Sequence, residues 1–207
     1  MPPAEDPGYE YHVFLSYRHL HEWRLWVERL FLPLFAHYLS EEVAGRAGAR
    51  IFCDVGIESG VAWPDELRSK LARSCVLVPL LSPKYFESDW CIEEFGHMRA
   101  RELQFKLGQG DHAGGLIVPA VIRGFPERFP AFANRVTPVD FRPYANIKMV
   151  ENGLKMERFT DVIMDWVHDV TAALSRAPEF TAWNAVLAAT TIDGIKKEIP
   201  VQRPVVR

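Results

Sequence analysis

The feature that most constrains the fold is an apolar run in the middle of the chain, which extends from Cys75 to Leu81 without a charged residue. A run of this length suits a β-strand better than a helix. A strand that shows no alternation of polar and apolar residues is covered on both faces, as central strands of parallel sheets are. The run therefore predicts a parallel sheet with helices on both of its faces.

Other strand-like and helical segments alternate around this run. Strands are expected over residues 11–16, 49–53 and 115–122, with a weaker one over 135–141. Apolar residues recur at helical intervals over 26–38, 63–73, 89–107 and 159–174. Strands that alternate with helices indicate βαβ units. We therefore expect five strands wound with helices into one α/β domain.

The helix over 26–38 and the end of the chain are less regular. Pro33 should kink the first helix or split it in two. After Ala177 the helical pattern weakens, with a short helix expected over 181–189 and a tail over 196–207. The predicted division is a flexible N-terminus (1–8), a domain (9–177) and a C-terminal extension or tail (178–207).

Composition narrows the classes of function. The formal net charge is −3 and the pI is about 6.2, which disfavours a nucleic-acid partner but leaves a local basic patch possible. The three cysteines show no metal-ligand spacing, so buried thiols in a reducing compartment are expected. No stretch approaches the ~20 apolar residues that span a bilayer, and no signal peptide is recognisable. We expect a cytoplasmic protein without a membrane segment.

Chemically notable residues gather just after three of the expected strands, where ligands bind in open α/β sheets. The first segment begins with Ser16 and ends with His19. The second covers 54–63 and the third covers 82–94. No glycine-rich dinucleotide fingerprint or phosphate-binding loop accompanies them.

These segments resemble the sequence boxes of bacterial TIR (Toll/interleukin-1 receptor) domains. Residues 13–18 look like the opening box, and 54–60 look like the second box, or BB loop. The third segment is the most specific, because it fixes seven residue types over thirteen positions. These are Ser82, Pro83, Tyr85, Ser88, Trp90, Cys91 and Glu94. The resemblance implies a flavodoxin-like open parallel five-stranded sheet with helices on both faces.

The resemblance implies two kinds of function. Many bacterial and plant TIR domains cleave NAD+ between nicotinamide and ribose, giving ADP-ribose or a cyclic isomer in defence or signalling. Others are adaptors that bind further TIR domains without catalysis. A nucleotide-sensing domain that binds without cleaving is a third reading. In the enzymes NAD+ is a substrate and no cofactor is implied; self-association and a separate effector or sensor protein are the partners expected.

Glu94 is the expected catalytic residue, because it occupies the place of the essential glutamate of TIR enzymes. Trp90 and Glu94 are four residues apart and should share one helix face. Cys91, Phe95 and Met98 should form a separate apolar face that packs in the core. Glu93 is rotated off the Trp90 face and is expected to meet solvent.

The remaining candidates have two readings each. Tyr17 and Arg18 resemble residues that line the nucleotide site in some TIR enzymes. Arg18 could bind the pyrophosphate or form a structural ion pair with Asp54. Trp90 could stack on a ring or pack in the core.

The BB-loop segment supplies the other candidates. Glu58 and Gly60 match the loop pattern, with Gly60 expected to supply a turn conformation. Trp63 could cap the second helix or contact the ligand. Ser16 and Ser82 are read as hydrogen-bonding residues at strand ends rather than as nucleophiles.

Overall fold

A computed structural model describes residues 8–43, 48–53, 65–108, 114–148 and 153–199. These residues form a five-stranded, entirely parallel sheet with the order β2-β1-β3-β4-β5. The strands are β1 (Tyr11–Tyr17), β2 (Ile51–Cys53), β3 (Ser74–Leu81), β4 (Ala120–Val121) and β5 (Val139–Asp140). The predicted α/β architecture is confirmed.

The central position of β3 explains its unbroken apolar sequence. It pairs with β1, where Val13 faces Val76, and with β4, where Leu80 faces Ala120. The strands β4 and β5 are shorter than the predicted runs. Pro119 has no N–H to give to a ladder, and upstream of it Ile117 makes an isolated bridge to Leu77.

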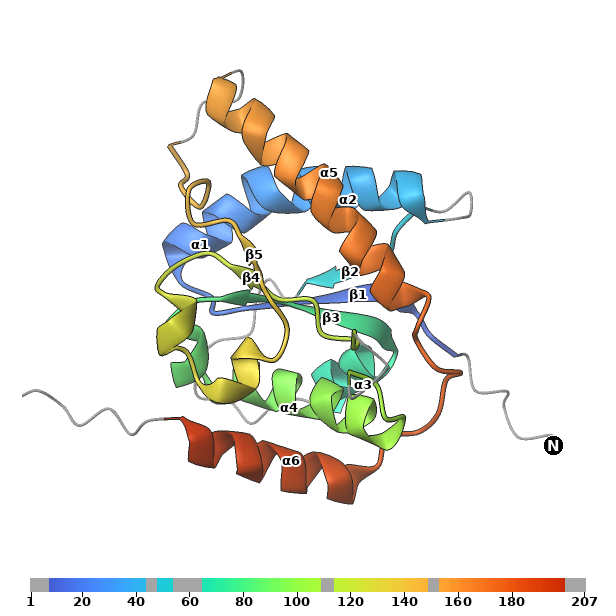
Figure 1. Ribbon diagram of the computed structural model, residues 1–207. Coiled ribbons are helices and arrows are strands. Elements are labelled where there is room, and N and C mark those ends of the chain that lie inside the picture. Colours follow the sequence, from blue (N-terminus) through green and yellow to red (C-terminus); the bar gives the residue numbers. More distant parts are fainter. Residues whose placement is uncertain (1–7, 44–47, 54–64, 109–113, 149–152, 200–207) are drawn as a thin grey trace, which may run out of the picture.

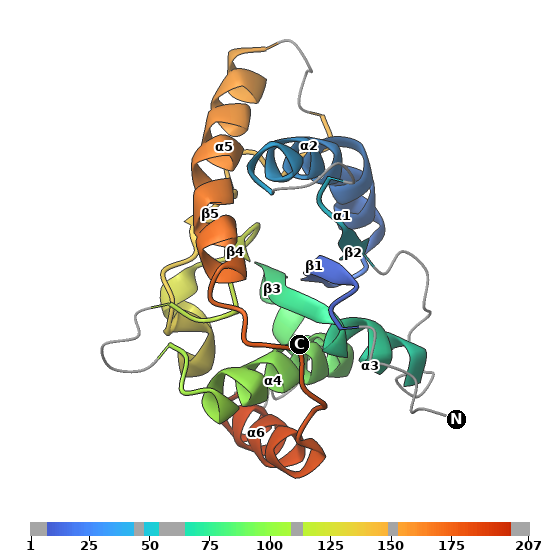
Figure 2. The same cartoon turned by 90° about the vertical axis from the view of Figure 1, so that its right-hand side faces the viewer.

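The helices form a layer on each face of the sheet (Figures 1 and 2). One face is covered by α1 (His21–Trp26), α2 (Leu32–Glu42) and α5 (Leu154–Leu174). The other is covered by α3 (Asp65–Ala72) and α4 (Asp89–Gln104). A further helix, α6 (Ala185–Glu198), packs on the outer side of α4. Short 3-10 turns lie at η2 (Tyr85–Glu87), η3 (Pro126–Arg128) and η4 (Ala131–Asn134).

Aromatic side chains fill the core between the sheet and the first of these layers. Phe35 and Trp166 bring α2 and α5 together with ring centroids 5.3 Å apart. Phe141, just after β5, meets the Trp166 ring edge-on, also at 5.3 Å. The apolar stripe predicted for 159–174 is the face of α5 that faces this core.

The predicted kink or split at Pro33 does not break the helix: residues 21–42 are helical throughout, with a widened turn just before Pro33. A π-helical segment, η1 (Val27–Phe31), joins α1 to α2, and Pro33 lies in the first turn of α2. Proline cannot donate the backbone hydrogen bond of a helix interior. The wider turn keeps the helix axis continuous, so Trp26 and Phe35 both remain buried.

The C-terminal extension is more ordered than predicted. The short helix expected over 181–189 is displaced and longer, and it includes Lys196, which was assigned to a tail. Asn184 caps its N-terminus by accepting a hydrogen bond from the backbone N–H of Leu187 at 3.0 Å. Ile192 and Ile195 are buried against the rest of the fold. Tertiary packing therefore stabilises a helix whose own pattern is weak.

Three absences concern only the described residues. No helix among them is both long and apolar enough to cross a membrane. No group of three or more His, Cys, Asp or Glu side chains within the described ranges is placed to hold a metal ion. Cys53, Cys75 and Cys91 form no disulfide bond among the described residues.

Candidate active site at the start of α4

Glu94 lies in the second turn of α4 and is 6% exposed. The helix begins at Asp89, just past the carboxyl end of β3. Ser88 caps it by accepting a hydrogen bond from the N–H of Cys91 at 3.4 Å. A buried carboxylate requires hydrogen-bond or charged partners to offset its lost hydration. The surroundings of Glu94 therefore decide what this residue can do.

Ser16 at the end of β1 provides such a partner. Its hydroxyl donates to a carboxylate oxygen of Glu94 at 2.5 Å and lies 2.9 Å from the hydroxyl of Tyr85. The Tyr85 hydroxyl also donates to the carbonyl oxygen of Cys91 at 3.2 Å. This cluster, which we call the Glu94 network (Ser16, Tyr85, Cys91 and Glu94), joins β1, η2 and α4 in the interior.

Burial controls the ionisation of the groups around Glu94. It raises the pKa of the Tyr85 phenol well above its ordinary value, and the nearby Cys91 and Glu94 raise it further. Burial likewise raises the pKa of the Cys91 thiol, with Glu94 as the second cause. A thiol held protonated is a poor nucleophile. Cys91 is thus a packing residue, and Glu94 is the group in this network that can supply negative charge.

The network lies where the chain changes direction across the sheet. From β1 the sheet extends on one side to β2 and on the other to β3. Ser16 belongs to the carboxyl end of β1, and α4 follows β3. In open parallel sheets the crevice at such a switch point, beyond the carboxyl ends of the strands, is the usual ligand site.

Arg18 lies at the edge of this site. Its guanidinium donates to the hydroxyl of Ser88, the residue that caps α4, at 3.3 Å. Arg18 is half-buried. Asp54, the alternative partner considered for Arg18, lies outside the described residues.

The sequence and the fold can be compared with those of known proteins. The family profile of the TIR domain matches residues 13–151. The chain belongs to the TIR domain family. Among solved structures it is similar to the TIR domains of the activated Roq1 resistosome directly recognizing the pathogen effector XopQ, at 20% identity and a TM-score of 0.40. That match covers 91% of this chain and 99% of the other. No curated protein matches.

The matched TIR region contains β1–β5 and α4 with Glu94, while α5 and α6 lie beyond it. The predicted domain of 9–177 would add α5 to the matched region. That helix packs against α2, so it shares the core of the TIR domain.

Tyr17 does not belong to the Glu94 network, and its place in the nucleotide site stays a prediction. Successive side chains of a strand point to opposite faces. Ser16 points towards α4, and Tyr17 is buried on the face covered by α1 and η1. Burial is the main cause that raises the pKa of Tyr17. The nearby Cys53 and Glu28, which lies on η1, raise it further. Its ring lies 4.5 Å from that of His19.

The other residues predicted to contact the substrate are Trp90, Glu58 and Trp63. Trp90 is half-buried in the first turn of α4 and packs partly against the core. Both roles predicted for Trp90, stacking on a ligand ring and packing in the core, stay predictions. Glu58 and Trp63, together with Gly60, lie outside the described residues, so their roles stay predictions.

Glu93 does not simply meet solvent as expected. Its carboxylate lies 3.3 Å from the amine of Lys196 on α6 and 3.9 Å from His97. The side chain is still 24% exposed, so it meets solvent as predicted and in addition pairs with α6, whose packing on α4 was not predicted. Tyr85 was quoted in the motif without a role. Only the fold reveals that it reaches Ser16, 69 residues earlier.

Proposed function

We propose that this TIR domain is an NAD+ nucleosidase. It cleaves the bond between nicotinamide and ribose and produces nicotinamide with ADP-ribose or a cyclic ADP-ribose isomer. The single observation that carries the proposal is the buried Glu94 carboxylate, held by Ser16 at the switch point of the sheet. A carboxylate in that position is suited to a cationic transition state.

The chemistry of NAD+ matches a site with one carboxylate. When the bond from C1′ to the nicotinamide nitrogen breaks, its electron pair goes to that nitrogen and the ring leaves neutral. No acid is needed for departure, unlike in the hydrolysis of ordinary glycosides. The ribose becomes oxocarbenium-like, and Glu94 stabilises this positive charge. Water that attacks C1′ loses a proton and gives ADP-ribose, whereas an adenine nitrogen of the same molecule gives the cyclic isomer.

Neighbouring residues would orient this carboxylate. Ser16 fixes one carboxylate oxygen, and Tyr85 fixes Ser16. A preoriented charge in a poorly hydrated site costs little reorganisation during the reaction. Arg18, at the capped start of α4, would contact the pyrophosphate. Trp90, Glu58 and Trp63 complete the proposed substrate contacts.

The proposed setting is bacterial antiviral defence or signalling in the cytoplasm. Self-association through the TIR domain would regulate activity, and a separate effector or sensor protein would act with it. Assembly could also complete the active site, as the resemblance to TIR enzymes implies.

The test compares wild-type protein with Glu94→Gln and Glu93→Gln at high protein concentration, with NAD+ as substrate. Nicotinamide release is measured, and the products are separated by chromatography. Glu94→Gln should lower release by at least ~100-fold, since it removes the charge but keeps the shape of the side chain. Glu93→Gln is the matched control, because the adjacent carboxylate pairs with Lys196 and lies near His97, outside the Glu94 network.

The results of the nicotinamide-release test distinguish an enzyme from an adaptor. Loss in Glu94→Gln alone supports the nucleosidase, and the product distinguishes hydrolase from cyclase. Equal activity in wild type and Glu94→Gln would remove Glu94 from catalysis. An absence of release from concentrated wild-type protein would favour a TIR–TIR adaptor.

A further inference from the structure

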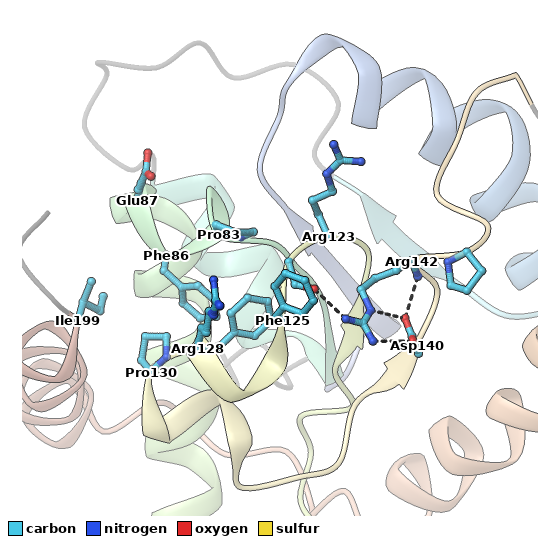
Figure 3. A pocket seen from close by; sticks show the side chains of 13 residues that line it. Pro83, Phe86, Glu87, Arg123, Phe125, Arg128, Pro130, Asp140, Arg142 and Ile199 are labelled. Carbon is cyan, nitrogen blue, oxygen red and sulfur yellow. Dashed lines mark hydrogen bonds and ion pairs between the residues drawn. The ribbon is translucent and has the colours of Figure 1, made fainter. Parts of the chain in front are cut away.

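A separate cavity of about 900 Å³ opens beyond the carboxyl ends of β4 and β5 (Figure 3). Its volume falls within the ~300–1,000 Å³ typical of small-molecule sites. The lining is mainly apolar and aromatic, with several arginines. Phe86 of η2 forms part of it, whereas the preceding Tyr85 belongs to the Glu94 network. The cavity is therefore a neighbour of the Glu94 network, separated from it by η2.

The charged residues of this cavity are not equally engaged. Arg142 binds both carboxylate oxygens of Asp140, each at 2.8 Å, and donates to the carbonyl of Gly124 at 2.9 Å. Glu87 pairs with Lys84 at 2.6 Å. These two acids are thereby neutralised within the protein. In the described part of the chain, Arg123 and Arg128 have no carboxylate partner.

An aromatic platform lies beside one of these arginines. The Arg128 guanidinium is 5.2 Å from the centre of the Phe125 ring, and Phe125 is 53% exposed. In Figure 3 Arg128 lies among the aromatic rings, while Arg123 extends towards the upper edge of the view. The guanidinium of Arg142 lies over the same Phe125 ring, 5.9 Å from its centre.

The walls of the cavity are fixed in place before any ligand arrives. The side-chain amide of Asn134 donates to the carbonyl of Pro126 at 2.9 Å, which holds the turn containing η3. Gly124 has a positive φ of 86°, and a β-carbon there would lie 2.9 Å from Pro83. The backbone N–H of Phe132 donates to Glu198 of α6 at 3.0 Å. Such preorganisation lowers the entropy cost of binding.

We propose that this cavity binds a nucleoside phosphate. The base would lie among the aromatic side chains that line the cavity, Phe86, Phe125 and Phe129, as flat rings prefer aromatic partners. The phosphate would take Arg123 and Arg128, because a guanidinium matches phosphate in charge and in hydrogen-bond geometry. This site is distinct from the Glu94 site and does not depend on cleavage of NAD+.

Calorimetric titration with ADP tests the proposal, since ADP has no nicotinamide bond to cleave. The double variant Arg123→Ala/Arg128→Ala should bind ADP at least tenfold more weakly than wild type. Arg158→Ala, an exposed arginine on α5, is the control for net charge and should leave the affinity unchanged. Glu94→Gln and Trp90→Ala should also keep the wild-type affinity, which separates this site from the proposed active site.

Two further titrations identify the ligand class. Inorganic phosphate and adenosine should each bind more weakly than ADP, because each makes only half of the contacts. Saturable ADP binding that survives the double variant would overturn the proposal, as would an absence of saturable binding. Loss of ADP binding in Trp90→Ala, with retention in the double variant, would assign the nucleotide to the Glu94 site and also overturn it.

Discussion

Gly96 offers a sharp test of how α6 is held on α4. This glycine is in the interior of α4, where alanine normally stabilises a helix by about 1 kcal/mol. Here a β-carbon would lie 2.4 Å from Cγ1 of Ile192 and 3.3 Å from its Cα on α6. The two helices approach too closely for any side chain at position 96. We therefore expect Gly96→Ala to destabilise the protein despite its better helix propensity.

The magnitude follows from two opposing contributions. Forcing a methyl group into a packed interface costs about 1–3 kcal/mol, and the helix gain offsets about 1 kcal/mol of this. The net loss should therefore be up to about 2 kcal/mol. In an Ile192→Ala background the shortest contact disappears, so Gly96→Ala should be neutral or stabilising by up to about 1 kcal/mol. The coupling between the two sites should then be about 2 kcal/mol.

Urea unfolding of wild type, both single variants and the double variant measures this cycle, provided that the m-value is constant. Hydrogen exchange of the α6 amides should rise in Gly96→Ala and return towards its level in Ile192→Ala when the two changes are combined. If Gly96→Ala stabilises the wild-type background, or destabilises both backgrounds equally, the close approach of α4 and α6 is not what selects glycine.

Two further predictions concern buried polar groups on or against α4. Ser16→Ala removes the hydroxyl that donates to Glu94 and should lower the free energy of unfolding by about 1–3 kcal/mol in urea titrations. An unchanged stability would show that Glu94 finds another donor. Burial lowers the pKa of His97 to about 4, with Arg68 as the second cause. The unfolded chain, with its ordinary histidine pKa of about 6.5, binds this proton first. Stability should therefore fall as the pH drops from about 6.5 to 4, by up to about 3 kcal/mol, and His97→Gln should lack that part of the pH dependence.

The sheet and most helices could be predicted because their signals are local. The run from Cys75 to Leu81 is apolar throughout since β3 is covered on both faces. The stripe of α5 has one phase over its whole length because one face meets the core. The spacing of Trp90 and Glu94 could likewise be read from the helical repeat. None of these features requires knowledge of a distant partner.

The rest depends on contacts between segments far apart in the chain. The contact between Ser16 and Glu94 could not be predicted, because the position of β1 relative to α4 is set only when the sheet assembles. Ser16 and Tyr17 must lie on opposite faces of the strand, but only the assembled fold shows which helices cover each face. The extent of α6 was missed because Ile192 and Ile195 become a buried stripe only against the surface that Gly96 leaves open.

The position of Glu94 explains why the first and third motif segments act together in this TIR domain. Ser16 comes from the first segment, and Tyr85 and Ser88 come from the third. Ser16 holds the carboxylate, Tyr85 links Ser16 to the backbone of α4, and Ser88 joins the helix start to Arg18. Replacement of Ser16, Tyr85 or Ser88 would change the orientation of the Glu94 carboxylate but would leave the carboxylate in place. If the charge of Glu94 acts on a developing cation, its energy depends on distance and surrounding polarity. Ser16, Tyr85 and Ser88 then contribute to catalysis by placing a charge that they do not themselves carry.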